Sequence, residues 1–164
     1  MRPLSQRGMG NRSFNGMRRP LTSGEIALVE QMFGQSINTA TVTVNARKWW
    51  PFQPKNVVMA PDGHIWCHPK GGLFCDDYST APRSLQALFI HEMTHVWQHQ
   101  SGIFLPLRRL PLARYAYTLT AGKPLRAYGL EQQAEIITHA FLALNEGSGE
   151  TALHSPWREA GVWG

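Results

Sequence analysis

The sequence predicts a single α+β domain, because helical and strand patterns both occur along it. Three segments, residues 21–34, 80–100 and 128–145, have apolar residues at the spacing of amphipathic helices. Between the first two lie an alternating β-branched segment at 40–45 and two short apolar runs separated by a turn. The chain has 164 residues, of which 43% are hydrophobic and 16% charged, enough for one buried core. This composition excludes a wholly disordered chain, and no apolar run approaches the ~18 residues of a transmembrane helix.

The N-terminal segment carries the net charge. The chain contains 16 Lys and Arg residues and 11 Asp and Glu residues, for a formal charge of +5. Residues 1–20 hold five arginines and no acidic residue, so the rest of the chain is neutral. We predict that residues 1–20 form a basic, flexible tail and that the neutral remainder does not bind nucleic acid. No apolar segment follows the arginines, so we expect no signal peptide and synthesis in the cytoplasm.

The first helix is predicted over residues 21–34. Thr22 and Glu25 fit a capping box, in which each side chain accepts a hydrogen bond from the backbone of the other residue. Gly34 provides the stop. Residues 40–45 then alternate in polarity and are rich in β-branched side chains, which predicts a strand.

A hairpin is predicted over residues 56–68. Two short strands, 56–60 and 64–68, flank a Pro-Asp-Gly turn at 61–63, in which proline fixes φ and glycine allows a positive φ. The segment 49–54 before them is aromatic and broken by prolines. It could line a cleft or cover the edge of the core, and we favour packing against the core.

Two further helices are predicted in the second half of the chain. Thr80 is the expected N-cap of a helix that runs to Gln100 and ends at Gly102. Residues 103–127 contain three prolines and form an irregular connection. The last helix, 128–145, has an apolar stripe along one face. Its members are Leu130, Ala134, Ile137, Phe141 and Leu144.

The segment His91-Glu92-Met93-Thr94-His95 is the candidate for chemistry. Its two histidines lie one helical turn apart on the same face, so both imidazoles can bind one zinc ion at ~2.1 Å. Glu92 lies roughly 100° round the helix from His91, where it can act as general base towards a water at the metal. Apolar neighbours predict a buried helix, in which these polar groups are costly unless they bind a ligand. The alternative is that the histidines only satisfy hydrogen bonds in the core.

A catalytic zinc site needs a third protein ligand. Position 101, six residues beyond His95, is Ser101, which excludes the metzincin pattern. His99 continues the i+4 series but is rotated away from the same metal, and we place it either on the helix surface or beside the metal ligands. Glu131 on the next helix is the better candidate, and Glu135 lies on the same face one turn later. One carboxylate can bind zinc while the other accepts a hydrogen bond from a ligand histidine.

These motifs resemble those of gluzincin metallopeptidases. The longer strings at 89–98 and 128–136 are similar to small zincin domains associated with VgrG and Rhs proteins of bacterial type VI secretion systems. The resemblance implies a zincin-like fold, with a small β-sheet or hairpin packed on the HExxH helix and on a second helix that bears a glutamate. It divides the chain into the tail 1–20, a zincin-like metallopeptidase domain at 21–145 and an unassigned C-terminal tail at 146–164.

The resemblance also implies the residue roles. His91, His95 and Glu131 would bind one zinc ion, and Glu92 would be the general base of peptide-bond hydrolysis. Many gluzincins have Asp where this chain has Glu135, whose side chain is one methylene longer. The implied substrate is a protein or peptide, the implied partners are spike proteins of the VgrG or Rhs type, and the implied route out of a bacterium is type VI export. The alternative is an adaptor module without hydrolytic activity, against which the intact Glu92 argues.

The sequence does not decide which residue stabilises the oxyanion or what the hairpin binds. Zincins provide a hydrogen-bond donor to the developing oxyanion. The candidates here are Tyr115, Tyr117, Tyr128 and His139. By analogy with zincins, the hairpin could pair with an extended substrate.

The two cysteines, Cys67 and Cys75, are also undecided. Their spacing permits a disulfide without requiring one. Together with His64 and His68 they match no known zinc-finger spacing, so we predict no second metal site.

Overall fold

The computed structural model describes residues 14–103 and 115–144. Three α-helices, four strands and three 3₁₀ turns follow one another in these ranges. In chain order they are β1 (Arg18–Pro20), α1 (Ser23–Phe33), η1 (Thr39–Thr41), β2 (Thr43–Asn45), β3 (Val58–Met59), β4 (Ile65–Cys67), η2 (Tyr78–Thr80), α2 (Arg83–Gln100), η3 (Leu125–Ala127) and α4 (Leu130–Leu144). The predicted α+β class is confirmed.

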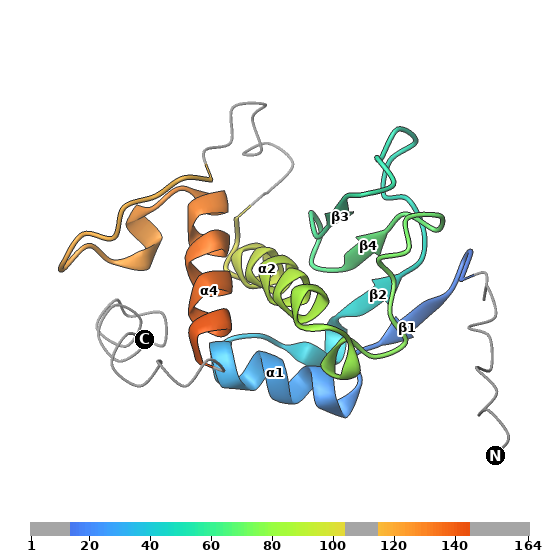
Figure 1. The fold of residues 1–164 in the computed structure, drawn as a ribbon, viewed down its shortest axis with the longest axis horizontal. Helices are drawn as coiled ribbons and strands as arrows, with labels where there is room; N and C mark the ends of the chain where they lie inside the picture. The colour runs from blue at the N-terminus through green and yellow to red at the C-terminus, as the bar shows by residue number, and fades with distance from the viewer. Residues whose placement is uncertain (1–13, 104–114, 145–164) are drawn as a thin grey trace, which may run out of the picture.

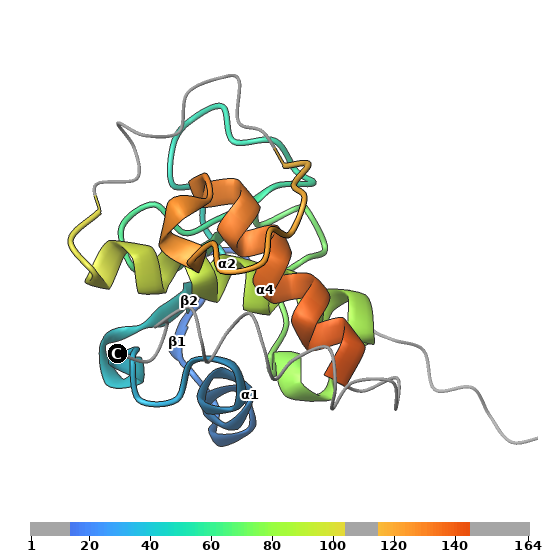
Figure 2. The same ribbon diagram turned by 90° about the vertical axis from the view of Figure 1, so that its left-hand side faces the viewer.

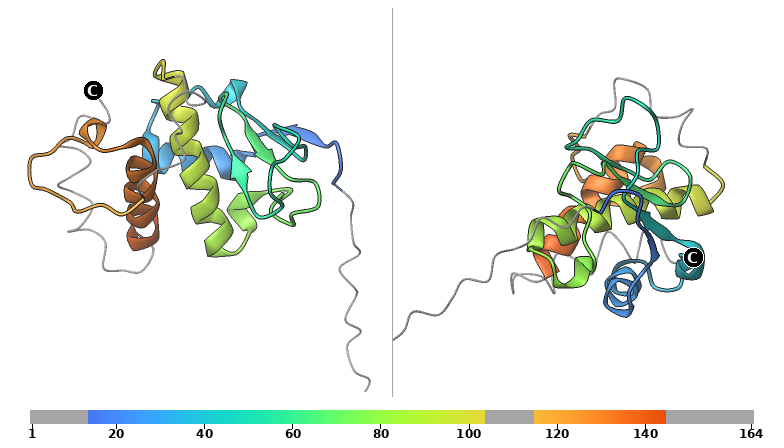
Figure 3. Two further views of the ribbon diagram at one scale, coloured as in Figure 1. Left: turned by 90° about the horizontal axis from the view of Figure 1, so that it is seen from above. Right: turned by 90° about the vertical axis from the view of Figure 1, so that its right-hand side faces the viewer.

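Helix α2 is the centre of the fold. Figure 1 and the left panel of Figure 3 show it between α4 on one side and the sheet on the other, with α1 beneath. Figure 2 shows α4 crossing in front of α2. The α2 face towards its neighbours buries Met93, Val96 and Trp97, and α4 buries Ala134 against it. The small side chain of Ala134 lets the two backbones approach, which brings the polar residues of both helices together.

The four strands form one mixed sheet in the order β1-β2-β4-β3. β1 is antiparallel to β2, β2 is parallel to β4, and β3 and β4 form the predicted antiparallel hairpin. The hairpin turn contains Gly63 at φ +84°, a conformation that L side chains rarely adopt. The strand predicted at 40–45 is shorter than expected, because residues 39–41 form the turn η1.

The predicted N-terminal tail extends too far, because residues 18–20 form β1. The guanidinium of Arg19 contacts both carboxylate oxygens of buried Glu25, at 2.7 and 2.8 Å, and donates to the carbonyl oxygen of Cys75. Counting charges does not distinguish a solvated arginine from one that pairs with a buried carboxylate. Residues 1–13 of the predicted tail, and the predicted C-terminal tail at 146–164, lie outside the described residues.

The predicted caps are present at α1, whereas the predicted N-cap of α2 is not. The capping box between Thr22 and Glu25 is present at α1, and Gly34 caps its C-terminus. The predicted N-cap of α2, Thr80, is wrong, because the structure places Pro82 there. Asp77 explains the difference: it accepts from the Ser79 backbone, which holds residues 78–80 in the turn η2 before α2 begins.

The segment 49–54 also differs from its prediction. Only Gln53 is buried, whereas Trp49, Trp50 and Phe52 are 38%, 40% and 80% exposed. Packing against the core is therefore wrong for its aromatic side chains. Among the described helices, none has the length and apolar character needed to cross a bilayer.

Candidate metal centre

The three predicted ligands come together between α2 and α4. Oε2 of Glu131 lies 3.4 Å from Nε2 of His91 and 3.2 Å from Nε2 of His95. The two imidazole rings are 5.2 Å apart and inclined at 75°. One potential ligand atom from each residue lies within 4.8 Å of the other two. The i+4 spacing on α2 and the first turn of α4 thus place two nitrogens and one oxygen around a common point.

The donor set fits a metal ion. His95 is fully buried and Glu131 is 7% exposed. Nε2 of His95 has no hydrogen-bond partner among the described residues, although it faces the Glu131 carboxylate. A buried, unsatisfied nitrogen costs free energy unless it meets a cation or a donor. Two imidazoles and one carboxylate also leave further coordination positions open, as in catalytic zinc sites.

Gln98, which the sequence analysis did not single out, holds His95 in place. Its amide nitrogen donates to the carbonyl oxygen of Leu130 and to Oε1 of Gln133, at 3.0 and 3.1 Å. Its Oε1 is therefore the atom that faces Nδ1 of His95, at 2.8 Å. Since that oxygen only accepts, Nδ1 carries the proton and the Nε2 lone pair points towards Glu131. The available signal was a glutamine three residues beyond His95, a spacing that puts both side chains on the same side of the helix.

Glu135 lies beside the other histidine. Its Oε1 is 3.4 Å from Nδ1 of His91. Burial disfavours a charged imidazole at His91, but Glu131, Glu92 and Glu135 outweigh it and raise its pKa. This concentration of negative charge around one ring attracts a cation.

Glu92 is 4% exposed and follows His91 directly on α2. Its charge acts on His91, and it contributes to the raised pKa of Cys67 on β4. A buried carboxylate next to the ligand cluster, yet outside the set of three, has the placement expected of a general base.

Two of the four candidate oxyanion donors are connected to this cluster. The Tyr117 hydroxyl lies 2.6 Å from Nδ1 of His139, and Nε2 of His139 is 3.6 Å from Oε2 of Glu135. The Tyr128 hydroxyl instead accepts from the Thr120 backbone. Tyr115 is 54% exposed.

The remaining candidate residues lie elsewhere. His99 packs against the hairpin turn, where a Cβ on Gly63 would lie 2.8 Å from its ring. Cys67 and Cys75 are both free thiols, and burial raises the pKa of Cys67 to about 12. Within residues 14–103 and 115–144, the only cluster of metal-ligating side chains is the one at His91.

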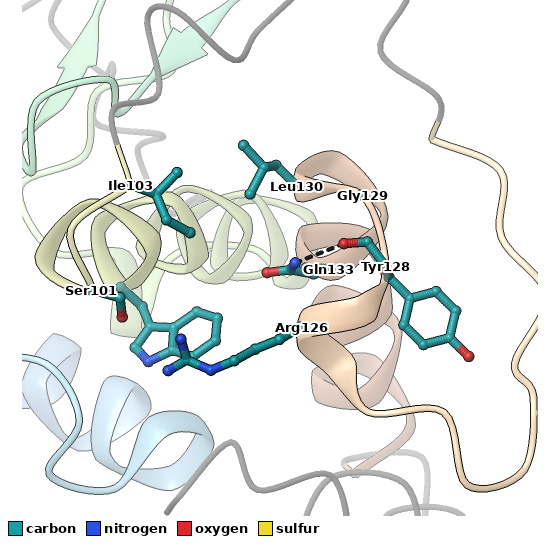
Figure 4. Close-up of a pocket in the computed structure, with 8 residues that line it drawn as sticks. Ser101, Ile103, Arg126, Tyr128, Gly129, Leu130 and Gln133 are labelled. Atoms are coloured by element: carbon teal, nitrogen blue, oxygen red, sulfur yellow. Dashed lines mark hydrogen bonds between the residues drawn. The ribbon is translucent and has the colours of Figure 1, made fainter.

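A pocket of about 340 Å³ lies between the C-terminal end of α2 and the N-terminal end of α4 (Figure 4). Gln133 lines it and donates to the carbonyl oxygen of Tyr128. Trp97 also lines the pocket, and the Arg126 guanidinium lies over its ring, 5.1 Å from the ring centroid. None of the three clustered residues lines this pocket, so it is separate from the candidate metal centre.

Comparison with known proteins places the chain in a family. No family model matches it. The solved effector domain of Pseudomonas aeruginosa VgrG2b is 38% identical and superposes with a TM-score of 0.76, over 91% of this chain and 88% of that one. This chain belongs to the VgrG2b effector-domain family. It is also 43% identical over 153 residues to the type VI secretion system spike protein VgrG2b of the same organism. That match covers 88% of this chain and 14% of the spike protein. The predicted relation to VgrG proteins of type VI secretion is confirmed.

Proposed function

We propose that this member of the VgrG2b effector-domain family is a zinc-dependent peptide hydrolase. His91, His95 and Glu131 would hold the zinc ion. The observation that carries the proposal is the convergence of three ligand atoms from two helices at one buried point, with Nε2 of His95 lacking a hydrogen bond among the described residues. Zinc bound there would supply the Lewis acidity that polarises a scissile carbonyl and acidifies water.

The other side chains have defined tasks in this proposal. Glu92 accepts the proton of the attacking water and delivers it to the leaving amine. Glu135 and Gln98 orient His91 and His95 through their Nδ1 atoms. Tyr117, oriented by His139, is our candidate for the donor to the developing oxyanion.

The substrate is proposed to be a protein or peptide in extended conformation. β3 lies at the edge of the sheet and pairs with β4 on one side. Its other side has no strand partner among the described residues, so its backbone groups are available to an added strand.

The biological setting follows from the relatives. Because they are a spike protein and its effector domain, we propose that this chain is delivered by type VI secretion in association with a VgrG-type spike. Its role would be that of the effector portion, since it corresponds to 14% of the spike protein's length.

Elemental analysis tests the metal site. Wild-type protein loaded with zinc should hold one ion per chain, and His95→Ala and Glu131→Ala should each lose most of it. Loss in His95→Ala alone would place the third ligand elsewhere. No zinc in any sample would overturn the proposal.

Hydrolysis tests the base. With quenched fluorescent casein as probe, wild-type protein should release fluorescence, and Glu92→Gln should retain zinc but lose activity by about 10²–10⁴-fold. Glu30→Gln, on the exposed face of α1, is the matched control and should behave as wild type. Equal rates for wild type and Glu92→Gln would contradict the assignment of the base.

A further inference from the structure

The loop between β2 and β3 presents aromatic side chains to solvent. Trp49, Trp50 and Phe52 are 38%, 40% and 80% exposed. The Trp50 and Phe52 rings contact each other edge to face, with centroids 5.8 Å apart. Figure 1 shows this loop as the teal segment above β3, on the side of the sheet away from α4. The proposed hydrolysis assigns no task to any residue of this loop.

The loop is held in this shape by specific hydrogen bonds. Buried Gln53 accepts from the Trp49 backbone and donates to the carbonyl oxygens of Val57 and Trp66. The Lys48 ammonium donates to the carbonyl oxygen of Pro51, at 2.8 Å. The one buried side chain thus serves as an anchor while the aromatic side chains are turned outward. Because the loop is fixed, their exposure is a feature of the folded protein.

Positive charge surrounds these rings. No acidic residue occurs between Glu30 and Asp62, a stretch that contains Arg47, Lys48 and Lys55. A second loop adds Lys70, and it packs so closely that a Cβ on Gly71 would collide with the Lys55 carbonyl. We call Lys48, Trp49, Trp50, Phe52, Lys55 and Lys70 the aromatic–lysine patch.

The imidazole of His68, next to this patch, is affected by the positive charges of its lysines. Partial burial and the three lysines Lys48, Lys55 and Lys70 together lower its pKa. The backbone geometry agrees: the Lys70 N–H donates to Nδ1 of His68, and the adjacent Gly71 packs against the Lys55 carbonyl. The patch is locally cationic while the chain beyond residue 20 is neutral overall.

Exposed aromatic side chains flanked by lysines match the surface of a bilayer. Trp and Phe side chains partition into the headgroup region, and nearby lysines are attracted by anionic lipids. Single-stranded nucleic acid also binds to aromatic and basic residues, but it needs open ring faces for base stacking. Here the edge of one ring meets a face of the other, so part of the stacking surface is already occupied, which favours insertion of the two rings as a compact apolar unit.

We propose that the aromatic–lysine patch docks this protein on membranes that contain anionic lipids. Phe52 and Trp50 enter the headgroup layer, and Lys48, Lys55 and Lys70 contact lipid phosphates. This binding is separate from hydrolysis, so it is measured without any substrate.

Vesicle co-sedimentation of the full chain tests the proposal. Wild-type protein should pellet with vesicles of mixed phosphatidylglycerol and phosphatidylcholine and remain in solution with phosphatidylcholine alone. At ~1 M salt, where the Debye length is about 3 Å, binding should be lost. Trp50→Ser/Phe52→Ser and Lys48→Glu/Lys55→Glu should each weaken partitioning by about tenfold or more.

Matched variants separate the patch from other charges and apolar groups. Leu119→Ser and Lys123→Glu change exposed residues in the segment before α4 and should bind as wild type. Arg2→Gln/Arg7→Gln/Arg12→Gln should retain most binding. Loss of binding in this arginine variant with no effect of the patch variants would overturn the proposal, as would patch-dependent binding of a single-stranded oligonucleotide with no binding to vesicles. Circular dichroism of each variant confirms that it is folded.

Discussion

Glu131 contributes the atom on which the candidate metal centre depends. Its Oε2 lies within 3.4 Å of Nε2 of both histidines, whereas Glu135 lies beside Nδ1 of His91 and Nε2 of His139. The two glutamates are one turn apart on α4 and have the same chemistry, so the difference in their position determines their difference in role.

This difference can be measured as zinc affinity. Glu131→Gln should weaken zinc binding by more than about 100-fold, because it removes a charged ligand. Glu135→Gln should weaken it by about 10–100-fold, because it replaces the charged acceptor beside His91 with a neutral amide oxygen. Competition with a chromophoric chelator gives both values. Equal losses in the two variants would contradict the assignment of Glu131 as the ligand.

Gln98 is a second residue whose role can be tested. Gln98→Leu removes the acceptor of the His95 Nδ1 proton and leaves the Leu130 carbonyl without its donor. We expect zinc affinity to fall by about 10–100-fold and the free energy of unfolding to fall by about 1–3 kcal/mol. Chelator competition and urea denaturation measure the two effects. Gln100→Leu, at the exposed end of the same helix, should leave zinc affinity unchanged.

At the scale of elements, the N-terminus of α1 is tied to the turn η2. The Thr22 hydroxyl donates to Asp77, at 3.0 Å, and Glu25 accepts from the Tyr78 backbone, at 2.9 Å. These bonds join segments more than fifty residues apart and leave few buried polar groups unpaired at this helix end. The start of α1 and the approach to α2 are therefore stabilised together.

Asp77 makes this junction dependent on pH. Partial burial opposes ionisation of Asp77, but hydrogen bonds from Ser79 and Thr22 and the charge of Arg19 outweigh it and lower its pKa. A carboxylate with a lowered pKa stabilises the fold above its unfolded pKa of ~3.9, and this stabilisation is lost as the pH falls through the folded pKa.

The variant Asp77→Asn tests this linkage. At pH 7 it should lower the free energy of unfolding by roughly 1 kcal/mol, because the amide accepts these hydrogen bonds less strongly. The gap between variant and wild type should narrow as the pH falls below ~4. Urea denaturation at several pH values measures the gap, and a constant gap down to the lowest pH would contradict the linkage.

At the scale of the whole molecule, the candidate metal centre connects two layers. α2 contributes both histidines and packs against the sheet, while α4 contributes Glu131 from the opposite side. A metal ion held by all three residues would therefore clamp α4 onto the rest of the domain, and its binding free energy would add to the stability of the fold.

Zinc removal should accordingly lower the melting temperature. At a free zinc concentration 100-fold above Kd, binding adds about 2.7 kcal/mol. At roughly 2–4 °C per kcal/mol, the expected difference between zinc-loaded and chelator-treated protein is about 5–10 °C. Differential scanning calorimetry measures it. His95→Ala should show little or no zinc-dependent shift, and a shift equal to that of wild type would place the zinc elsewhere.

Local patterns in the sequence predicted much of this protein. The HExxH spacing, the capping box at Thr22 and the Pro-Asp-Gly turn act over four or five residues, where backbone geometry alone brings the groups together. The separation of Glu131 and Glu135 by one turn likewise placed both on one face of α4.

Other features depended on contacts between distant segments. Arg19 lies in β1, where its guanidinium pairs with Glu25 and donates to the Cys75 carbonyl. Gln98 meets Gln133 only because α2 and α4 pack against each other. The choice of Glu131 as the residue facing both histidines, and the outward direction of Trp50, depend on the same long-range packing. The sequence by itself determined which groups could act together within one turn or one hairpin. Only the tertiary structure decided which groups from different elements meet, because burial and hydrogen bonding across the core select one partner among several of similar chemistry.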